Sequence, residues 1–287
     1  ADTVSAVPFT RPDRGLIKDI AFGHYGVQGT ESPLLMDAYI PEGKGPFPGV
    51  ILVHGGGWEA GDKTTYITPV FEPLARNGFA WFSINYRLTP THGHQAQLDD
   101  VRRAVRYVRH HADAFHIDSR RLALLGESAG GQLAAQVASR PCDGSPSAED
   151  PVDRESCEVQ ALISFYGVYD FEALIEEGDR LSMLERIFGH TRLDSSARET
   201  LRAYSPIHHV EGLKAPALLI HGTGEMLWGQ ALRYSEKLEA AGRRFELHRL
   251  RGAPHGMENW EGREEWTGYK AHLVSWLDRI LRRKAAE

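Results

Sequence analysis

The sequence of 287 residues lacks the features that mark membrane, nucleic-acid-binding and disulfide-rich proteins. No run approaches the 18 consecutive apolar residues of a membrane-spanning helix, and no block of like charges is present. Acidic residues outnumber basic ones by 39 to 33, so the concentrated positive surface that nucleic acids require is not expected. Because there are only two cysteines, the fold must depend on a hydrophobic core. We therefore expect a compact chain whose partners are neither nucleic acids nor membranes.

The two cysteines bear on the compartment. Cys142 and Cys157 flank a polar stretch rich in Asp, Ser and Pro, which predicts a surface loop. The chain begins at Ala1 with no charged-then-apolar leader, as a mature exported protein or a trimmed chain would. In an exported protein, a disulfide between the two cysteines would stabilise the fold by about 3 kcal/mol. We expect a secreted or periplasmic protein, and the alternative is a cytoplasmic enzyme with two free thiols.

Apolar strands alternate with helix-length segments along the chain. Strands are expected at 16–24, 33–40, 50–53, 79–86, 121–125, 159–166, 217–221 and 245–250, and helices at 66–76, 95–112, 129–139, 229–241 and 264–281. This alternation predicts an α/β fold, with a mostly parallel twisted sheet, helices on both faces and an antiparallel edge formed by the first two strands. No repeat or composition break divides the chain. Residues 1–287 are therefore predicted to form one domain, with a small helical insertion at about 167–210.

A candidate nucleophile, Ser128, lies in the pattern GESAG at 126–130. An apolar strand precedes the pattern and a helix of small residues follows it, which is the strand–turn–helix setting that exposes a reactive serine above a sheet. We expect glycine to be required at both ends, because a larger side chain would collide with the neighbouring strand and helix. Glu127 is expected to project away from the pocket and to form a structural ion pair.

Three consecutive glycines follow another buried strand, in the pattern HGGGW at 54–58. By chance this pattern is about ten times rarer than G-x-S-x-G in a chain of this composition. Consecutive glycines let backbone N–H groups turn into a cavity, where they can stabilise the oxyanion formed when an ester carbonyl is attacked. We assign the N–H groups of Gly56, Gly57 and Ala129 to an oxyanion hole, and we expect His54 to hold the loop in place.

A serine hydroxyl needs a neutral base, and His255 is the histidine best placed for this role. It lies in GAPHG at 252–256, directly after the last predicted strand, where a parallel sheet binds its ligands. The acid that orients the imidazole is expected after the preceding strand. From residue 222 through 235 the only carboxylate is Glu225. The competing acid is Glu258, three residues past the histidine.

Taken together, the motifs HGGGW, GESAG, HGTGE and PHG resemble those of α/β-hydrolase esterases of the hormone-sensitive-lipase-like group. The closer similarity is to bacterial acetyl-xylan and feruloyl esterases. Further similar stretches are NYRL at 85–88, DDVRRAV at 99–105 and IDSRRLALLGESAGG at 117–131, and the resemblance covers about residues 30–280. It implies an α/β-hydrolase fold and a catalytic triad of Ser128, Glu225 and His255. Where that group most often has an aspartate, this chain has Glu225.

These residues predict a serine carboxylesterase that works through an acyl-enzyme, without a metal or an organic cofactor. The resemblance favours carbohydrate-linked acetyl or feruloyl esters as substrates. Trp58, Trp228 and Trp260 are candidates for an aromatic wall that binds a feruloyl ring or a sugar, although core packing explains them equally well. The alternatives are a general short-chain carboxylesterase or lipase, and a non-catalytic protein of the same fold that binds a ligand.

Overall fold

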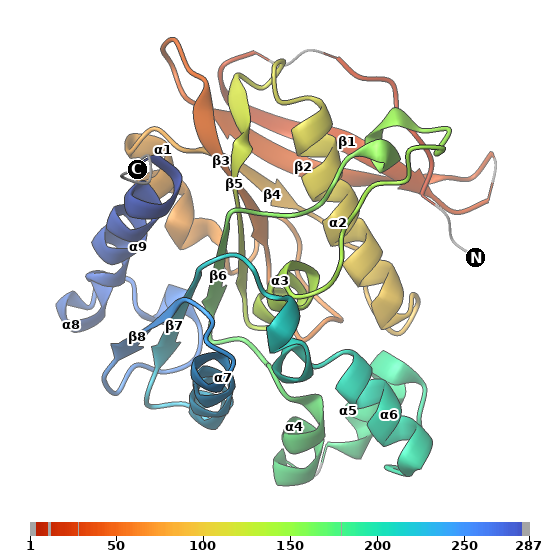
Figure 1. The fold of residues 1–287 in the computed structure, drawn as a ribbon, viewed down its shortest axis with the longest axis vertical. Coiled ribbons are helices and arrows are strands. Elements are labelled where there is room, and N and C mark those ends of the chain that lie inside the picture. Colours follow the sequence, from red (N-terminus) through yellow and green to blue (C-terminus); the bar gives the residue numbers. More distant parts are fainter. Residues whose placement is uncertain (1–3, 11–12, 28, 179, 283–287) are drawn as a thin grey trace.

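The computed structural model describes residues 4–10, 13–27, 29–178 and 180–282, and an eight-stranded sheet forms its centre (Figure 1). The strands are β1 (Gly15–Tyr25), β2 (Ser32–Ile40), β3 (Phe47–Val53), β4 (Ala80–Ile84), β5 (Ile117–Glu127), β6 (Ala161–Phe165), β7 (Ala217–Gly222) and β8 (Phe245–Leu250). Their spatial order is β1-β2-β4-β3-β5-β6-β7-β8. β2 is antiparallel to both β1 and β4, and the other neighbouring strands are parallel. The predicted parallel sheet with an antiparallel edge is confirmed.

Helices cover both faces of the sheet (Figure 1). One face carries α2 (His94–His110), α3 (Ala129–Ala138) and α7 (Trp228–Ala240), and the other carries α1 (Phe71–Arg76) and α9 (Tyr269–Leu277). Each face has its own core, because successive side chains of a strand point to opposite sides. In β3, Ile51 and Val53 belong to one core, and Val50 and Leu52 belong to the other. This double burial explains why β3 is an unbroken apolar run.

Two of the predicted helices are shorter or interrupted. The one expected at 66–76 begins only with a 3-10 turn at Thr68–Val70, because Tyr66 has a φ of +62° that no right-handed helix accepts. The closing helix expected at 264–281 is divided at Gly268, a poor helix former, into α8 (Glu264–Thr267) and α9. Among the helices that the structure describes, none combines the length and the apolar character needed to cross a bilayer.

Three short helices follow β6 within the predicted insertion, namely α4 (Phe171–Gly178), α5 (Leu181–Phe188) and α6 (Ser195–Ala203). They are grouped at the lower right of Figure 1. Ion pairs hold them: Arg198 and Arg202 of α6 bind Glu172 of α4. Arg186 of α5 binds Glu59, which lies just past the HGGGW motif. The interpretation of this segment as the partial cap of a single domain stays a prediction.

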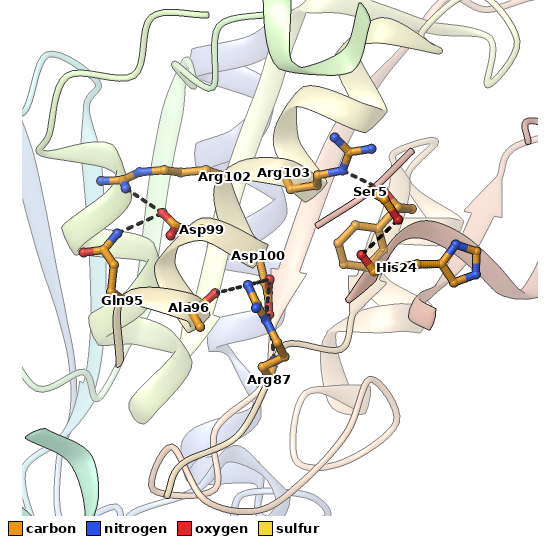
Figure 2. Close-up of polar contacts among 10 residues, drawn as sticks. Ser5, His24, Arg87, Gln95, Ala96, Asp99, Asp100, Arg102 and Arg103 are labelled. Carbon is orange, nitrogen blue, oxygen red and sulfur yellow. Dashed lines mark hydrogen bonds and ion pairs between the residues drawn. The ribbon is translucent and has the colours of Figure 1, made fainter. Parts of the chain in front are cut away.

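A buried ion pair ties α2 to the segment that follows β4. Arg87 donates to the Asp100 carboxylate from Nη2 at 2.7 Å and from Nε at 2.9 Å (Figure 2). Two residues further on, the Thr89 N–H donates to the carbonyl of Trp58 at 3.0 Å. Gln97 of α2 donates to the same carbonyl at 2.8 Å. The glycines that precede Trp58 are therefore held in place from the α2 side of the sheet.

The two cysteines form a disulfide in the segment between α3 and β6. The Cα atoms of Cys142 and Cys157 are 5.1 Å apart, and both side chains are buried. Arg106 of α2 holds the same segment, because it donates to the carbonyl oxygens of Glu155 and Asp143 at 3.0 and 3.1 Å. The predicted surface loop is thus closed by a covalent bond and fastened to the core by a helix.

Candidate active site

Ser128 occupies a strained turn between β5 and α3. Its φ of +53° and ψ of −118° are rare for a residue with a side chain, and its N–H donates to the carbonyl of Phe165 at 2.9 Å. A Cβ at Gly126 would lie 2.0 Å from the Gly130 carbonyl oxygen. A Cβ at Gly130 would lie 2.1 Å from the Val53 carbonyl oxygen. The predicted requirement for glycine at both ends of the motif is confirmed.

The structure brings together the side chains of Ser128, His255 and Glu225 from three separate loops. His255 Nε2 lies 3.0 Å from Ser128 Oγ, and His255 Nδ1 lies 3.1 Å from Glu225 Oε2. The histidine side chain is 40% exposed and the glutamate side chain is 4% exposed, so the imidazole faces an open surface while the carboxylate is enclosed. The competing Glu258 instead folds its carboxylate back over Gly256. Of the two acids, the geometry therefore favours Glu225.

Three donors hold the Glu225 carboxylate. The Leu227 N–H donates to Oε2 at 3.0 Å, His255 contacts the same oxygen, and His221 Nε2 contacts Oε1. Burial raises the pKa of this carboxyl, but the interactions with His221 and His255 outweigh it and lower the pKa to about 2. Glu225 is consequently ionised at every pH at which the protein can be expected to work.

His221 is a residue of the site that the sequence reasoning missed. It is the fifth residue of β7, its side chain is fully buried, and burial lowers its pKa, so the imidazole is neutral. A neutral imidazole can donate one N–H to a carboxylate. Its position in the sequence was the available signal. His221 lies four residues before Glu225, at the end of the strand that leads into the loop of this acid.

The HGGG segment, which we call the glycine loop (residues 54–57), lies directly against α3. A Cβ at Gly130 would be 2.4 Å from the carbonyl oxygen of His54. Gly56 and Gly57 have φ values of +106° and +62°, which favour glycine. Within the described ranges, the N–H groups of Gly56, Gly57 and Ala129 have no hydrogen-bond partner. These three N–H groups remain available as hydrogen-bond donors, and their assignment to an oxyanion hole stays a prediction.

His54 holds the glycine loop, as predicted. Its ring stacks on Tyr86 with centroids 4.4 Å apart, and its Nδ1 lies 2.6 Å from the carbonyl oxygen of Gly55. Burial lowers the pKa of His54 to about 4, so its imidazole stays neutral. The Tyr86 hydroxyl donates to the His54 carbonyl at 2.9 Å. The loop is therefore fixed through both the side chain and the backbone of its first residue.

Glu127 does not form the predicted ion pair, and that prediction is wrong. Its side chain is almost fully buried and accepts a hydrogen bond from the N–H of Gly55. Among the described residues, no ion pair reaches this carboxyl. Burial raises its pKa to about 8, so the group is protonated at neutral pH. The prediction failed because the glycine loop, 72 residues away in sequence, packs over this carboxyl.

The three candidate tryptophans have different surroundings. Trp260 is completely buried and donates from its indole to the Pro254 carbonyl at 2.8 Å, so its predicted place in a substrate wall is wrong. Trp58 is 2% exposed and donates to Gln132 Oε1 at 2.9 Å, so it offers a substrate almost no surface. Trp228 is half-buried on the loop of Glu225 and keeps part of its ring accessible.

Residues 36–231 match the BD-FAE family. Esterase LipC of Mycobacterium tuberculosis is 32% identical over 246 residues, which are 84% of this chain and 60% of that protein. The probable carboxylic ester hydrolase LipM of the same organism is 31% identical over 185 residues, 64% of this chain and 42% of that protein. The chain therefore spans less than two thirds of the length of these relatives.

Solved structures are similar over most of the chain. An acetyl ester-xyloside bifunctional hydrolase from Caldicellulosiruptor lactoaceticus superposes with a TM-score of 0.76 and 26% identity, over 87% of this chain and 89% of that one. A truncated carbohydrate esterase from gut microbiota superposes with a TM-score of 0.78 over 96% of this chain and 99% of that one. The second is 20% identical and supports the fold alone.

Proposed function

The chain belongs to the BD-FAE family of α/β-hydrolase esterases, and from this premise we propose that it is a serine carboxylesterase. One observation carries the proposal: Ser128, His255 and Glu225 form a hydrogen-bonded series, with distances of 3.0 and 3.1 Å. A hydroxyl becomes a competent nucleophile when a neutral imidazole accepts its proton, and the imidazole becomes a stronger base when an ionised carboxylate orients it. The three groups are in the order that acyl transfer needs.

The proposed reaction proceeds through an acyl-enzyme. His255 accepts the proton of Ser128 as Oγ attacks the ester carbonyl, and the resulting oxyanion accepts hydrogen bonds from Gly56, Gly57 and Ala129. His255 then gives its proton to the leaving alcohol as the carbon–oxygen bond breaks. A water molecule, deprotonated by the same imidazole, then attacks the acyl group. His255 returns this proton to Ser128 Oγ as the bond between Oγ and the acyl carbon breaks, which releases the carboxylic acid. Glu225 stays ionised throughout and stabilises the imidazolium.

The proposed substrates are carbohydrate-linked acetyl or feruloyl esters. The supporting observations are the likeness to a protein titled an acetyl ester-xyloside bifunctional hydrolase and the surface beside Glu225. There, Met226 is 75% exposed and the ring of Trp228 is partly accessible, so an aromatic acid or a sugar face could pack on them. Against a lipase, the helices α4 and α6 are joined by arginine–glutamate pairs, so charged side chains form the contact between them.

The esterase proposal is tested by turnover and by labelling. We expect the protein to hydrolyse p-nitrophenyl acetate and to be labelled on Ser128 by a fluorophosphonate probe. Ser128→Ala should keep the melting temperature within a few degrees and lose both activities, because no other hydroxyl occupies that turn. A folded protein that neither turns over the ester nor takes the label would instead support a non-catalytic, ligand-binding role. Appreciable turnover by Ser128→Ala would mean that the nucleophile is wrong.

A substrate panel tests the finer proposal. We expect kcat/KM for acetylated xylan oligosaccharides or methyl ferulate to exceed that for p-nitrophenyl esters of longer fatty acids. The physical reason is that Met226 and the half-buried Trp228 beside Glu225 suit a sugar face or an aromatic ring. A preference for long-chain esters would replace the carbohydrate esterase proposal with a lipase.

We also propose that the protein works in an oxidising compartment, secreted or periplasmic. The disulfide between Cys142 and Cys157 supports this location, since such bonds persist where thiols are not kept reduced. Intact-mass measurement of protein isolated without reductant should give a value two hydrogens below that of the reduced chain. Full alkylation of both thiols in the native, unreduced protein would contradict the proposal.

A further inference from the structure

Two buried side chains that take no part in the proposed reaction connect the three loops that carry it. Glu127 directly precedes Ser128, and its carboxyl accepts the N–H of Gly55 in the glycine loop. Tyr166 directly follows β6, beside the end of β5 that holds Glu127, and its hydroxyl accepts the N–H of Met257 at 2.8 Å. Met257 lies two residues after His255. The series therefore runs from the glycine loop, through the residue beside the nucleophile, to the end of the histidine loop (residues 252–257).

The packing around this series leaves little freedom. Tyr166 is fully buried and has a φ of +36°, a conformation that surrounding contacts must impose. Its N–H donates to the Ile220 carbonyl at 2.8 Å, and its ring lies 4.6 Å from the ring of His255. A Cβ at Gly55 would lie within 2.2 Å of the Glu127 carboxyl, so loop and carboxyl are in direct contact.

We propose that Glu127 and Tyr166 form a brace that sets the position of the oxyanion donors relative to His255 during acyl transfer. The inference rests on the proposed esterase function. The glycine loop and the histidine loop come from opposite halves of the sequence, and the oxyanion donors act only if they lie at hydrogen-bond distance from the atom that becomes charged. One hydrogen bond from the glycine loop to the buried carboxyl, and one from the histidine loop to the adjacent tyrosine, fix that relationship.

The chemistry of the brace predicts which substitutions it tolerates. Burial keeps Glu127 protonated at neutral pH, with a pKa of about 8, so its carboxylic acid offers one acceptor and one donor. A glutamine has the same shape and also offers an acceptor and a donor. Leucine fills a similar volume but leaves the Gly55 N–H without its acceptor. Phenylalanine at position 166 keeps the ring and removes the acceptor for the Met257 N–H.

The experiment compares four single variants of the full chain by kcat and KM on p-nitrophenyl acetate and by affinity for a phenylboronic acid, whose tetrahedral serine adduct mimics the oxyanion. Glu127→Leu and Tyr166→Phe should each lower kcat about tenfold or more, weaken boronate binding by a similar factor and leave KM within about threefold. Glu127→Gln should stay within about threefold of the parent in all three quantities. A loss of kcat and boronate affinity with a nearly unchanged KM distinguishes a positioning role from a role in substrate binding.

Tyr169→Phe is the matched control. Tyr169 is also fully buried, lies three residues after Tyr166 and donates to Ser164 Oγ at 2.8 Å, so this variant loses one buried hydrogen bond that involves neither the glycine loop nor the histidine loop. Its melting temperature should fall by about as much as that of Tyr166→Phe, while kcat and boronate affinity stay at parent values. If it loses kcat equally, general destabilisation explains the effect and the brace is wrong.

A double variant tests whether the two residues act as one unit. Glu127→Leu combined with Tyr166→Phe should lose no more kcat than the worse single variant. Additive losses, unchanged kcat in both single variants, or a Glu127→Gln variant as slow as Glu127→Leu would each overturn the proposal. If Glu127→Leu does not fold, Tyr166→Phe and Glu127→Gln still decide it. A parent protein without turnover or Ser128 labelling would instead refute the esterase function itself.

Discussion

Two buried glutamates flank the catalytic serine and histidine, and they are in opposite protonation states. Glu225 has two histidines and a backbone N–H around its carboxylate, and its pKa is lowered to about 2. Glu127 has a backbone N–H and a tyrosine but no basic partner, and its pKa is raised to about 8. Burial raises the pKa of both groups, so the difference comes from the donors that surround each carboxyl.

This difference matches the two kinds of work that we propose. An acid that must stabilise an imidazolium has to be charged, and the two histidines keep Glu225 charged. A group that only holds a loop needs a hydrogen-bond acceptor and not a charge, and a neutral carboxyl in an apolar setting supplies one. The comparison therefore predicts that replacing the glutamate by glutamine lowers activity severely at position 225 and has almost no effect at position 127.

Removing the charge of the catalytic acid gives the largest expected effect. Glu225→Gln should lower kcat by roughly 10⁴-fold, the loss expected when the group that orients a catalytic imidazole no longer selects its tautomer. Glu258→Gln, the control, should change kcat by less than about threefold. Steady-state kinetics on p-nitrophenyl acetate checks both. The reverse pattern would transfer the role of the acid to Glu258 and remove the basis of the comparison.

Removing the second histidine around the acid should have an intermediate effect. His221→Leu takes one hydrogen bond from a charged carboxylate, worth about 1.5–3 kcal/mol, and kcat should fall about 10- to 100-fold. His221→Gln supplies an N–H near the same place and should recover part of the loss. Kinetics with both variants at matched fold stability is the measurement. Parent-like activity in His221→Leu would show that one imidazole suffices to hold Glu225.

The low pKa of Glu225 should appear in acid stability. A carboxyl whose pKa is depressed in the folded state stabilises the protein above its unfolded-state pKa of about 4.5, and this contribution disappears as pH falls towards 2. Urea unfolding of the parent should therefore give a free energy that declines over this window. Glu225→Gln should show a smaller decline. Equal slopes would contradict an ionised acid in the folded protein.

The raised pKa of Glu127 should change the stability of the fold with pH in the opposite direction. This is the smallest of the expected effects. The folded protein keeps a proton that the unfolded chain releases, so the stabilisation is complete below pH 4.5 and is lost as pH rises through about 8. Tyr86, Tyr166 and Glu258 interact electrostatically with the same carboxyl. Glu127→Gln should reduce this loss of unfolding free energy with rising pH. An unchanged slope would mean that Glu127 is ionised in the fold.

The comparison also shows where sequence reasoning stops. Ser128, Glu225 and His255 could be found from the sequence, because each follows a strand of a parallel sheet, and such strand ends meet at one edge. His221 was missed because its role depends on which way a fully buried side chain points. Glu127 was misread because its partner, Gly55, is 72 residues away. No local pattern reports a contact of that kind.

For the fold, the arrangement of the sheet could be predicted from the sequence, but the ends of the helices could not. The mostly parallel sheet and its antiparallel edge followed from the alternation of apolar strands and helices, but the ends of the elements depended on particular residues. The positive φ of Tyr66 delayed one helix, and Gly268 divided another. The position of Trp260, five residues past the base, fits a substrate contact and core packing equally well. Its indole turns inward to the Pro254 carbonyl, a choice that spacing alone does not determine.

The glycines at both ends of the serine turn limit how this protein can change. Gly126 and Gly130 each leave less than 2.2 Å for a first side-chain carbon, so no ordinary amino acid can replace either one without moving a strand or a helix. Random mutagenesis should therefore recover almost no functional alternative at these two codons. New substrate preferences would have to arise elsewhere, for example at an exposed side chain such as Met226.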